Sequence, residues 1–251
     1  MLFRSGKITL TFPIYKRPHT STFLMSFYCK YKKFNMINRI PFSMLSKIGM
    51  YDIKIQGTMV KVSVVDNSSV VDAKIDELKS LLQTLQKRVV GFDVKILENR
   101  IAKLMLLCVG TRCLIIQLCH LDRIPESLKQ FLANQTTCFL GTGMAKINRV
   151  LIDDKNIDCW SCVEVGHFAA RILKDPAIEK YGLPELAVLT GIYIKEPGIK
   201  YLDWIWNSRM LSEEHIKYAI HNAYTSYVIG NKLLNMLHCH IGVRFPTISR
   251  N

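Results

Sequence analysis

The order of strand-like and helix-like segments constrains the fold of this chain more than any other feature of its sequence. Runs of apolar residues, alternating or continuous, predict five strand regions, at 51–65, 88–94, 103–109, 112–118 and 137–141. The first region alternates and turns near Gln56-Gly57, so it forms a hairpin. Gly110-Thr111 joins the third and fourth regions as a second, tight hairpin. Strands therefore dominate the first half of the chain.

Helical patterns fill the spaces between these strands and nearly all of the last third. Apolar spacing and capping residues predict helices at 70–86, 125–133, 146–152, 163–173, 184–190 and 212–237. Asn67 or Ser68 caps the first, and Ser212 caps the last, where Glu213 and Glu214 suit the helix dipole. This order predicts an α/β fold in which a mixed central sheet is flanked by helices and the C-terminal half is helical.

Size and charge narrow the class of protein. The 251 residues are 49% hydrophobic and 22% charged, which is typical of a globular chain with one substantial core. The net charge of +14 favours a polyanionic partner. Charge alone does not separate nucleic acid from a membrane surface or an organelle address.

The basic residues are concentrated at the N-terminus. Residues 1–51 hold nine Lys and Arg and no acid, which leaves 14 − 9 = +5 for the rest. This is typical of an organelle transit peptide, but also of an unstructured extension upstream of a later start at Met25, Met36, Met44 or Met50. We therefore expect a leader at 1–50, a folded domain at 51–240 and a tail at 241–251. The expected location is intracellular, in the nucleus or cytoplasm, or in an organelle if the leader is a transit peptide.

The eight cysteines mostly lie in apolar, strand-like segments, where a free thiol behaves as a small hydrophobic group. This favours free thiols in a reducing compartment over a disulfide framework. The longest apolar stretch, 104–109, is far too short to span a bilayer, so we expect no membrane partner.

Asp93 bears most directly on function. It ends the apolar run 89–92 and is followed two positions later by Lys95. Near the far end of the chain, Tyr218 and Asn222 lie four residues apart in the predicted helix 212–237, and so share one helix face.

These two motifs, in this order, resemble the first and last motifs of the DEDDy 3'-5' exonucleases. The plant Werner-syndrome-like exonuclease group is the most similar. Three more segments carry the resemblance: 107–118, 124–132, and the series Trp206, Arg209, Leu211 and Ser212. It covers roughly residues 51–237 and implies a ribonuclease-H-like exonuclease fold.

In that family four carboxylates bind two divalent metals, and a tyrosine orients the attacking water. The resemblance places Asp93 and Tyr218 at matching positions. The other three positions, expected to be acidic, hold Lys95, Ile147 (with Asn148 beside it) and Asn222. The metal site is thus expected to be degenerate, with Asp93 as its only remaining ligand.

Exchanging Glu for Lys beside a metal changes the local charge by two units. Each unit is worth about 4 kcal/mol at 4 Å and an effective dielectric of 20, so we expect most metal affinity to be lost. In an alternative arrangement, Lys95 points away and Glu98 reaches the metal instead. We expect no cofactor, with Mg²⁺ or Mn²⁺ needed only if some activity remains.

The leading functional prediction is a nucleic-acid-binding domain, for a single strand or a 3' end, without catalysis. The predicted contacts are Lys95, Lys146, Arg149, Trp206, Arg209 and Lys217. Trp206 or Tyr218 could stack on a base, although each of these residues could equally be a solvated charge or a core aromatic. A weakly active metal-dependent exonuclease on DNA or RNA and a protein-interaction scaffold are the alternatives. The sequence predicts no oligomeric state.

Two other chemistries have weaker sequence support. Cys159 and Cys162 with His167, and possible ligands from His238-Cys239-His240, have some of the spacing of a zinc site. Gly141-Thr142-Gly143 lacks the third glycine and the Lys-Ser/Thr of a phosphate loop, which argues against a nucleotide site.

Overall fold

The computed structural model describes residues 49–85, 88–97, 100–195 and 203–242. The chain divides into two units, residues 1–41 and 42–251, and all described residues lie in the second. Most of the predicted leader and tail, and Glu98, lie outside the described residues. None of the described helices is long and apolar enough to cross a membrane.

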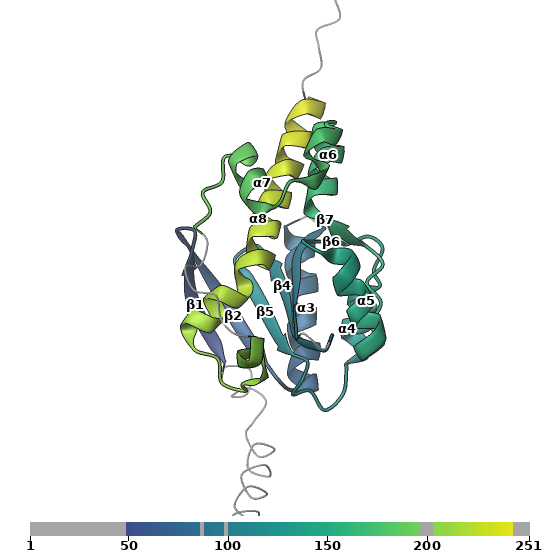
Figure 1. Cartoon of the computed structure of the whole chain (residues 1–251), viewed down its shortest axis with the longest axis vertical. Helices are drawn as coiled ribbons and strands as arrows, with labels where there is room; N and C mark the ends of the chain where they lie inside the picture. Colours follow the sequence, from purple (N-terminus) through teal and green to yellow (C-terminus); the bar gives the residue numbers. More distant parts are fainter. Residues whose placement is uncertain (1–48, 86–87, 98–99, 196–202, 243–251) are drawn as a thin grey trace, which may run out of the picture. The chain divides into compact units, whose positions relative to one another are not determined.

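A seven-stranded mixed sheet forms the centre of the described region (Figure 1). Its strands are β1 (Met50–Ile55), β2 (Thr58–Val65), β3 (Val89–Ile96), β4 (Ala102–Val109), β5 (Arg112–Gln117), β6 (Cys138–Gly141) and β7 (Cys162–Glu164). Their order across the sheet is β1-β2-β5-β4-β3-β6-β7. Strands β3, β4 and β5 form an antiparallel meander, and β6 and β7 continue from β3 as parallel strands.

The helices cover both faces of this sheet. They are α3 (Ser68–Thr84), α4 (Glu126–Leu132), α5 (Met144–Lys155), α6 (Val165–Leu173), α7 (Leu183–Thr190) and α8 (Glu213–Gly242), with 3₁₀ helices η1 (Pro176–Lys180) and η2 (Asp203–Asn207). The crossovers through α3, α4 and α5 all connect parallel strands and all advance toward β7. Since such crossovers are right-handed, these three helices share one face, and α8 runs across the other (Figure 1).

The predicted fold class is confirmed: an α/β domain with a mixed sheet, flanking helices and a helical C-terminal half. The strands of the meander are almost wholly buried, which explains why their sequences are continuous apolar runs. Two local differences stand out. The predicted helix 163–173 begins as the short strand β7, and the two 3₁₀ helices were not predicted.

Helix α8 packs directly on β3 at Gly91. A Cβ atom at this position would lie 1.9 Å from the carbonyl oxygen of Ala223 and 2.8 Å from Cβ of Tyr227. No side chain larger than hydrogen fits there. This close approach places the N-terminal turns of α8, with Tyr218 and Asn222, beside the second half of β3.

The cysteine prediction is wrong for four residues, because two disulfides form among the described residues. Cys108 and Cys113 lie directly opposite each other on β4 and β5, with Cα atoms 4.3 Å apart. The register of the hairpin therefore brings them together. Cys159 and Cys162 pair in the loop between α5 and β7. Cys119 and Cys138 are free thiols.

Candidate functional site

The candidate site lies where β3, β6 and β7 end. These strands are parallel, with Gly91 opposite Leu140 and Gly141 opposite Glu164, so their carboxyl ends meet at one edge of the sheet. In α/β sheets this edge is the usual place for a ligand. Asp93 projects from β3 two residues beyond the last β3–β6 pair.

Asp93 and Lys95 form an ion pair at this edge. The Asp93 side chain is 10% exposed, and its Oδ2 lies 2.6 Å from Nζ of Lys95. Oδ1 accepts a hydrogen bond of 2.8 Å from the backbone N–H of Val94. The two side chains meet because residues two apart on a strand share one face. The ammonium therefore neutralises the carboxylate, and the alternative in which Lys95 points away from the site is wrong.

Two aromatic rings extend this pair. Nζ of Lys95 lies 5.7 Å from the ring centroid of Tyr218, within the range of a cation–π contact. The Tyr218 ring stacks on Trp206, with centroids 5.9 Å apart and planes 12° apart. Three elements, β3, α8 and η2, thus meet in one chain of contacts.

This arrangement changes the expected role of Trp206. The residue is 2% exposed, so its ring is not accessible to a nucleotide base in this conformation. Trp206 belongs to the core rather than to the nucleic-acid contacts. Tyr218 is half-buried and supports Lys95 from α8.

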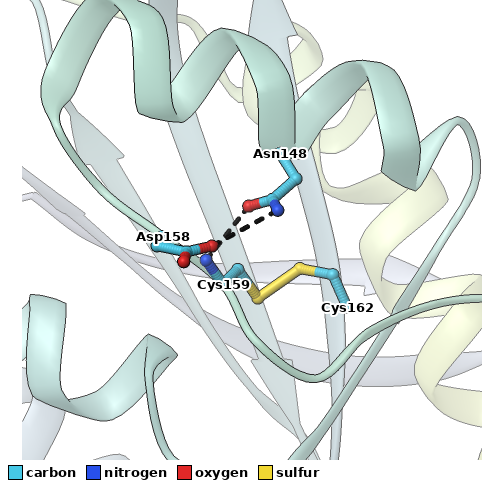
Figure 2. Close-up of a disulfide and its surroundings, with 4 residues drawn as sticks. All are labelled: Asn148, Asp158, Cys159 and Cys162. Carbon is cyan, nitrogen blue, oxygen red and sulfur yellow. Dashed lines mark hydrogen bonds between the residues drawn. A yellow bond between two sulfur atoms is a disulfide. The ribbon is translucent and has the colours of Figure 1, made fainter.

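The positions expected for the middle acid supply no oxygen ligand to the Asp93 site. Ile147 is 5% exposed and packs in the core under α5. Asn148 is committed elsewhere: its Oδ1 accepts the backbone N–H of Cys159 at 3.0 Å, and its Nδ2 donates to Asp158 at 3.4 Å (Figure 2). Asn148 therefore fixes the loop after α5.

Asn222 lies on α8 one turn after Tyr218 and is half-buried. It presents an amide where the family has a carboxylate. Within the described ranges, no three His, Cys, Asp or Glu side chains lie close enough together to hold a metal ion, either here or at Cys159 and Cys162. The described part of the chain therefore supports neither a two-metal site at Asp93 nor the zinc hypothesis.

The remaining predicted contacts are cations on the surface. Lys146 and Arg149 are exposed on α5, and Lys217 is exposed on α8. Arg209 is also exposed, but its Nη1 forms an ion pair of 2.8 Å with Asp66, which offsets its charge. The structure therefore gathers Asp93, Lys95, Tyr218 and Trp206 by direct contact, and leaves the other cations as separate surface charges.

Sequence reasoning missed Glu164, the last residue of β7. Its carboxylate accepts the backbone N–H groups of Gly143 at 3.1 Å and Met144 at 3.0 Å. The cap residue of α5, Gly143, has no side chain, so Glu164 satisfies the first turn in its place and complements the helix dipole. The only signal was indirect: a helix start with glycine at the cap and no acid in its first turn.

Comparisons with known proteins find relatives among 3'-5' exonucleases. No protein-family model matches the chain. The bifunctional 3'-5' exonuclease/ATP-dependent helicase WRN of Mus musculus is 27% identical over 157 residues, or 59% of this chain. The match spans only 11% of the mouse protein, so the chain corresponds to a small part of that relative.

Solved structures of the EXD2 exonuclease domain also match. One soaked in Mn and GMP is 20% identical with a TM-score of 0.42, and covers 74% of this chain and 99% of that chain. One soaked in Mg and dGMP is 20% identical with a TM-score of 0.43, and covers 76% and 100%. From the sequence match to WRN, the chain is homologous to 3'-5' exonuclease domains, as its motifs predicted.

Proposed function

We propose that this domain has an exonuclease-like fold, binds nucleic acid and does not cleave it. The observation that carries the proposal is the contact of 2.6 Å between Lys95 and Asp93. The ammonium provides the positive charge that a metal would otherwise supply to this carboxylate. A metal would have to displace the ammonium and would then find one carboxylate.

The energy of that displacement is unfavourable. Mg²⁺ requires near-octahedral oxygen coordination, and a two-metal site needs several carboxylates to offset the repulsion between the ions. An adjacent Lys in place of Glu changes the interaction by two charge units, each worth about 4 kcal/mol at 4 Å. We therefore expect the chain to keep the fold but to lack a metal site that could activate a water molecule.

Binding would rest on the cations around this edge. Lys146, Arg149 and Lys217 are exposed and can contact phosphates, while Lys95 can shift from Asp93 toward a phosphate at the end of a strand. The proposed partner is a single strand or a 3' end, of DNA or RNA. We further place the domain in the plant Werner-syndrome-like group, on the strength of segments 107–118 and 124–132.

The test uses the full-length chain and a 3'-labelled single-stranded 20-mer. Fluorescence anisotropy should show binding that weakens with salt, with a slope of about −0.7 per phosphate contact in a log–log plot. The strand should keep its length during long incubation with Mg²⁺ or Mn²⁺. The double variant Lys146→Gln/Arg149→Gln should reduce the slope by about 1.4, because two phosphate contacts are lost.

Lys54→Gln/Lys61→Gln is the matched control. It removes the same charge from exposed positions on β1 and β2, at the opposite edge of the sheet, and should leave the slope unchanged. Shortening of the strand by the wild type but not by Asp93→Asn would establish the weak-exonuclease alternative. Absence of binding at low salt would favour the scaffold alternative.

A further inference from the structure

The disulfide between Cys159 and Cys162 lies in the loop that connects α5 to β7 (Figure 2). Cys159 is 2% exposed, whereas Cys162 is partly exposed. Trp160, between them, is 64% exposed, so the loop faces solvent. Cys162 is therefore the more exposed of the two cysteines, in a loop that faces solvent.

The second disulfide provides an internal contrast. Cys108 and Cys113 are 0% and 3% exposed and lie within the sheet core, in adjacent strands of the meander. A reagent can reach these sulfurs only if the hairpin opens. The same chain thus holds one inaccessible pair and one pair at the surface.

Both ends of the surface disulfide are connected to α5. At one end, the backbone N–H of Cys159 is bound by Asn148 of α5. At the other, Cys162 begins β7, and Glu164 two residues later caps the first turn of α5 through Gly143 and Met144. The disulfide therefore links covalently the two segments that contact α5, one through Asn148 and one through Glu164. Lys146 lies in this part of α5.

We propose that Cys159 and Cys162 are a site of reversible oxidation, a dithiol–disulfide couple that reacts with small-molecule disulfides of the glutathione type and thereby fixes the cationic helix α5. The oxidation site itself is independent of the proposed function. Its effect on binding rests on the proposed function, since it assumes that Lys146 and Arg149 contact phosphates.

The chemistry balances as a two-step exchange. The Cys162 thiolate attacks one sulfur of the small disulfide, which releases one small thiolate and leaves a mixed disulfide on Cys162. The Cys159 thiolate then attacks the Cys162 sulfur and releases the second small thiolate. The protein loses two electrons, the small disulfide gains two, and the two cysteine protons end on the two released thiols.

The short loop suits reversibility. Only two residues separate the cysteines, and a disulfide that closes so short a loop constrains the unfolded chain little. Its reduction need not unfold the domain. In the dithiol state, the contacts of Asn148 and Glu164 and the pairing of β7 with β6 would remain, but the covalent link would be lost, so the first turn of α5 should open more often.

The experiment equilibrates the full-length chain in buffers of varied reduced-to-oxidised glutathione ratio. After acid quenching, differential alkylation and mass spectrometry report each cysteine. We expect Cys159 and Cys162 to titrate together, at ratios that leave Cys108–Cys113 oxidised. Hydrogen exchange should show faster amide exchange at Gly143 and Met144 in the reduced protein. Independent titration of the two thiols, or reduction only after Cys108–Cys113, would overturn the proposal.

Cysteine variants distinguish oxidation of Cys159 and Cys162 from its effect on strand binding. Reduction should lower affinity for the labelled 20-mer by roughly three- to tenfold, because the phosphate contacts of α5 become less well positioned. Cys159→Ser/Cys162→Ser, and Cys162→Ser alone, should bind at the reduced level in every buffer, while Cys108→Ser/Cys113→Ser should still respond. Unchanged affinity on reduction would overturn the coupling. A normal cysteine titration without strand binding would overturn the proposed function alone.

Discussion

Two positions on β3, four residues apart, differ in what they demand of a side chain. At Gly91 the demand is steric, because a Cβ atom would lie 1.9 Å from the carbonyl oxygen of Ala223. At Lys95 the demand is electrostatic: the side chain is 14% exposed and is held by Asp93 and Tyr218. The packing of α8 on β3 thus depends on the shape of the residue at position 91, and the candidate site depends on the charge at position 95.

Gly91→Ala tests the steric half of this contrast and should have the largest effect. The added methyl group overlaps backbone and must push α8 away from β3, which we expect to cost at least about 3 kcal/mol of unfolding free energy. Urea denaturation measures it. Gly191→Ala is the control: nothing lies within 4 Å of that Cβ, and only its φ of +67° is unfavourable. A cost near 1–2 kcal/mol is expected there, and equal costs at both positions would contradict the packing argument.

Lys95→Met tests the electrostatic half. Removing the ammonium leaves Asp93 nearly buried without a counter-ion, so the unfolding free energy should fall by about 3 kcal/mol. Asp93→Asn in the same chain removes the stranded charge and should recover most of the loss. A double-mutant cycle in urea gives the coupling energy. If the two single variants were additive, the ion pair would have no energetic role.

Glu164→Gln tests the cap on α5, with a smaller expected effect. The amide keeps only one acceptor oxygen, so one of the two hydrogen bonds and the charge that complements the helix dipole are lost, at a cost of about 1 kcal/mol. Thermal unfolding measures this change, and Glu214→Gln, exposed at the start of α8, is the comparison variant. Amide hydrogen exchange at Gly143 and Met144 should also be faster in Glu164→Gln than in the wild type. Unchanged exchange would show that Glu164 does not hold the first turn of α5.

The last prediction concerns the alkylation rate of Cys138. It involves no substitution, so it does not change the structure. This thiol lies on β6, and burial raises its pKa to about 11. A higher pKa lowers the thiolate fraction, so at pH 8 its alkylation should be about 100-fold slower than in the unfolded chain. The rate should rise about tenfold per pH unit up to pH 10. Alkylation at the unfolded rate would show that the pKa of this thiol is not raised in the folded chain.

The sequence predicted the parts that depend on local pattern. Continuous apolar runs predicted the strands of the meander, and Gly110-Thr111 predicted their hairpin. The period of two in a strand, which brings residues i and i+2 to one face, accounts for the Asp93–Lys95 contact. These features require no knowledge of distant segments.

Features that depend on tertiary packing were not predicted. Cys108 meets Cys113 because of the register of the hairpin, and their apolar context suggested free thiols instead. Trp206 is buried because η2 packs on Tyr218, which lies in a different element. The Glu164 cap joins residues 20 and 21 positions apart, a distance that no local pattern reports.

The most direct test of the proposed function is calorimetric titration of Mn²⁺ into the full-length wild type, Asp93→Asn and the variant Lys95→Glu/Asn222→Asp. Each sample is then incubated with the 3'-labelled strand. We expect no Mn²⁺ binding and an intact strand for the first two, and a gain of Mn²⁺ binding for the third. Wild-type protein that bound Mn²⁺ and shortened the strand, with both properties lost in Asp93→Asn, would contradict the proposed function.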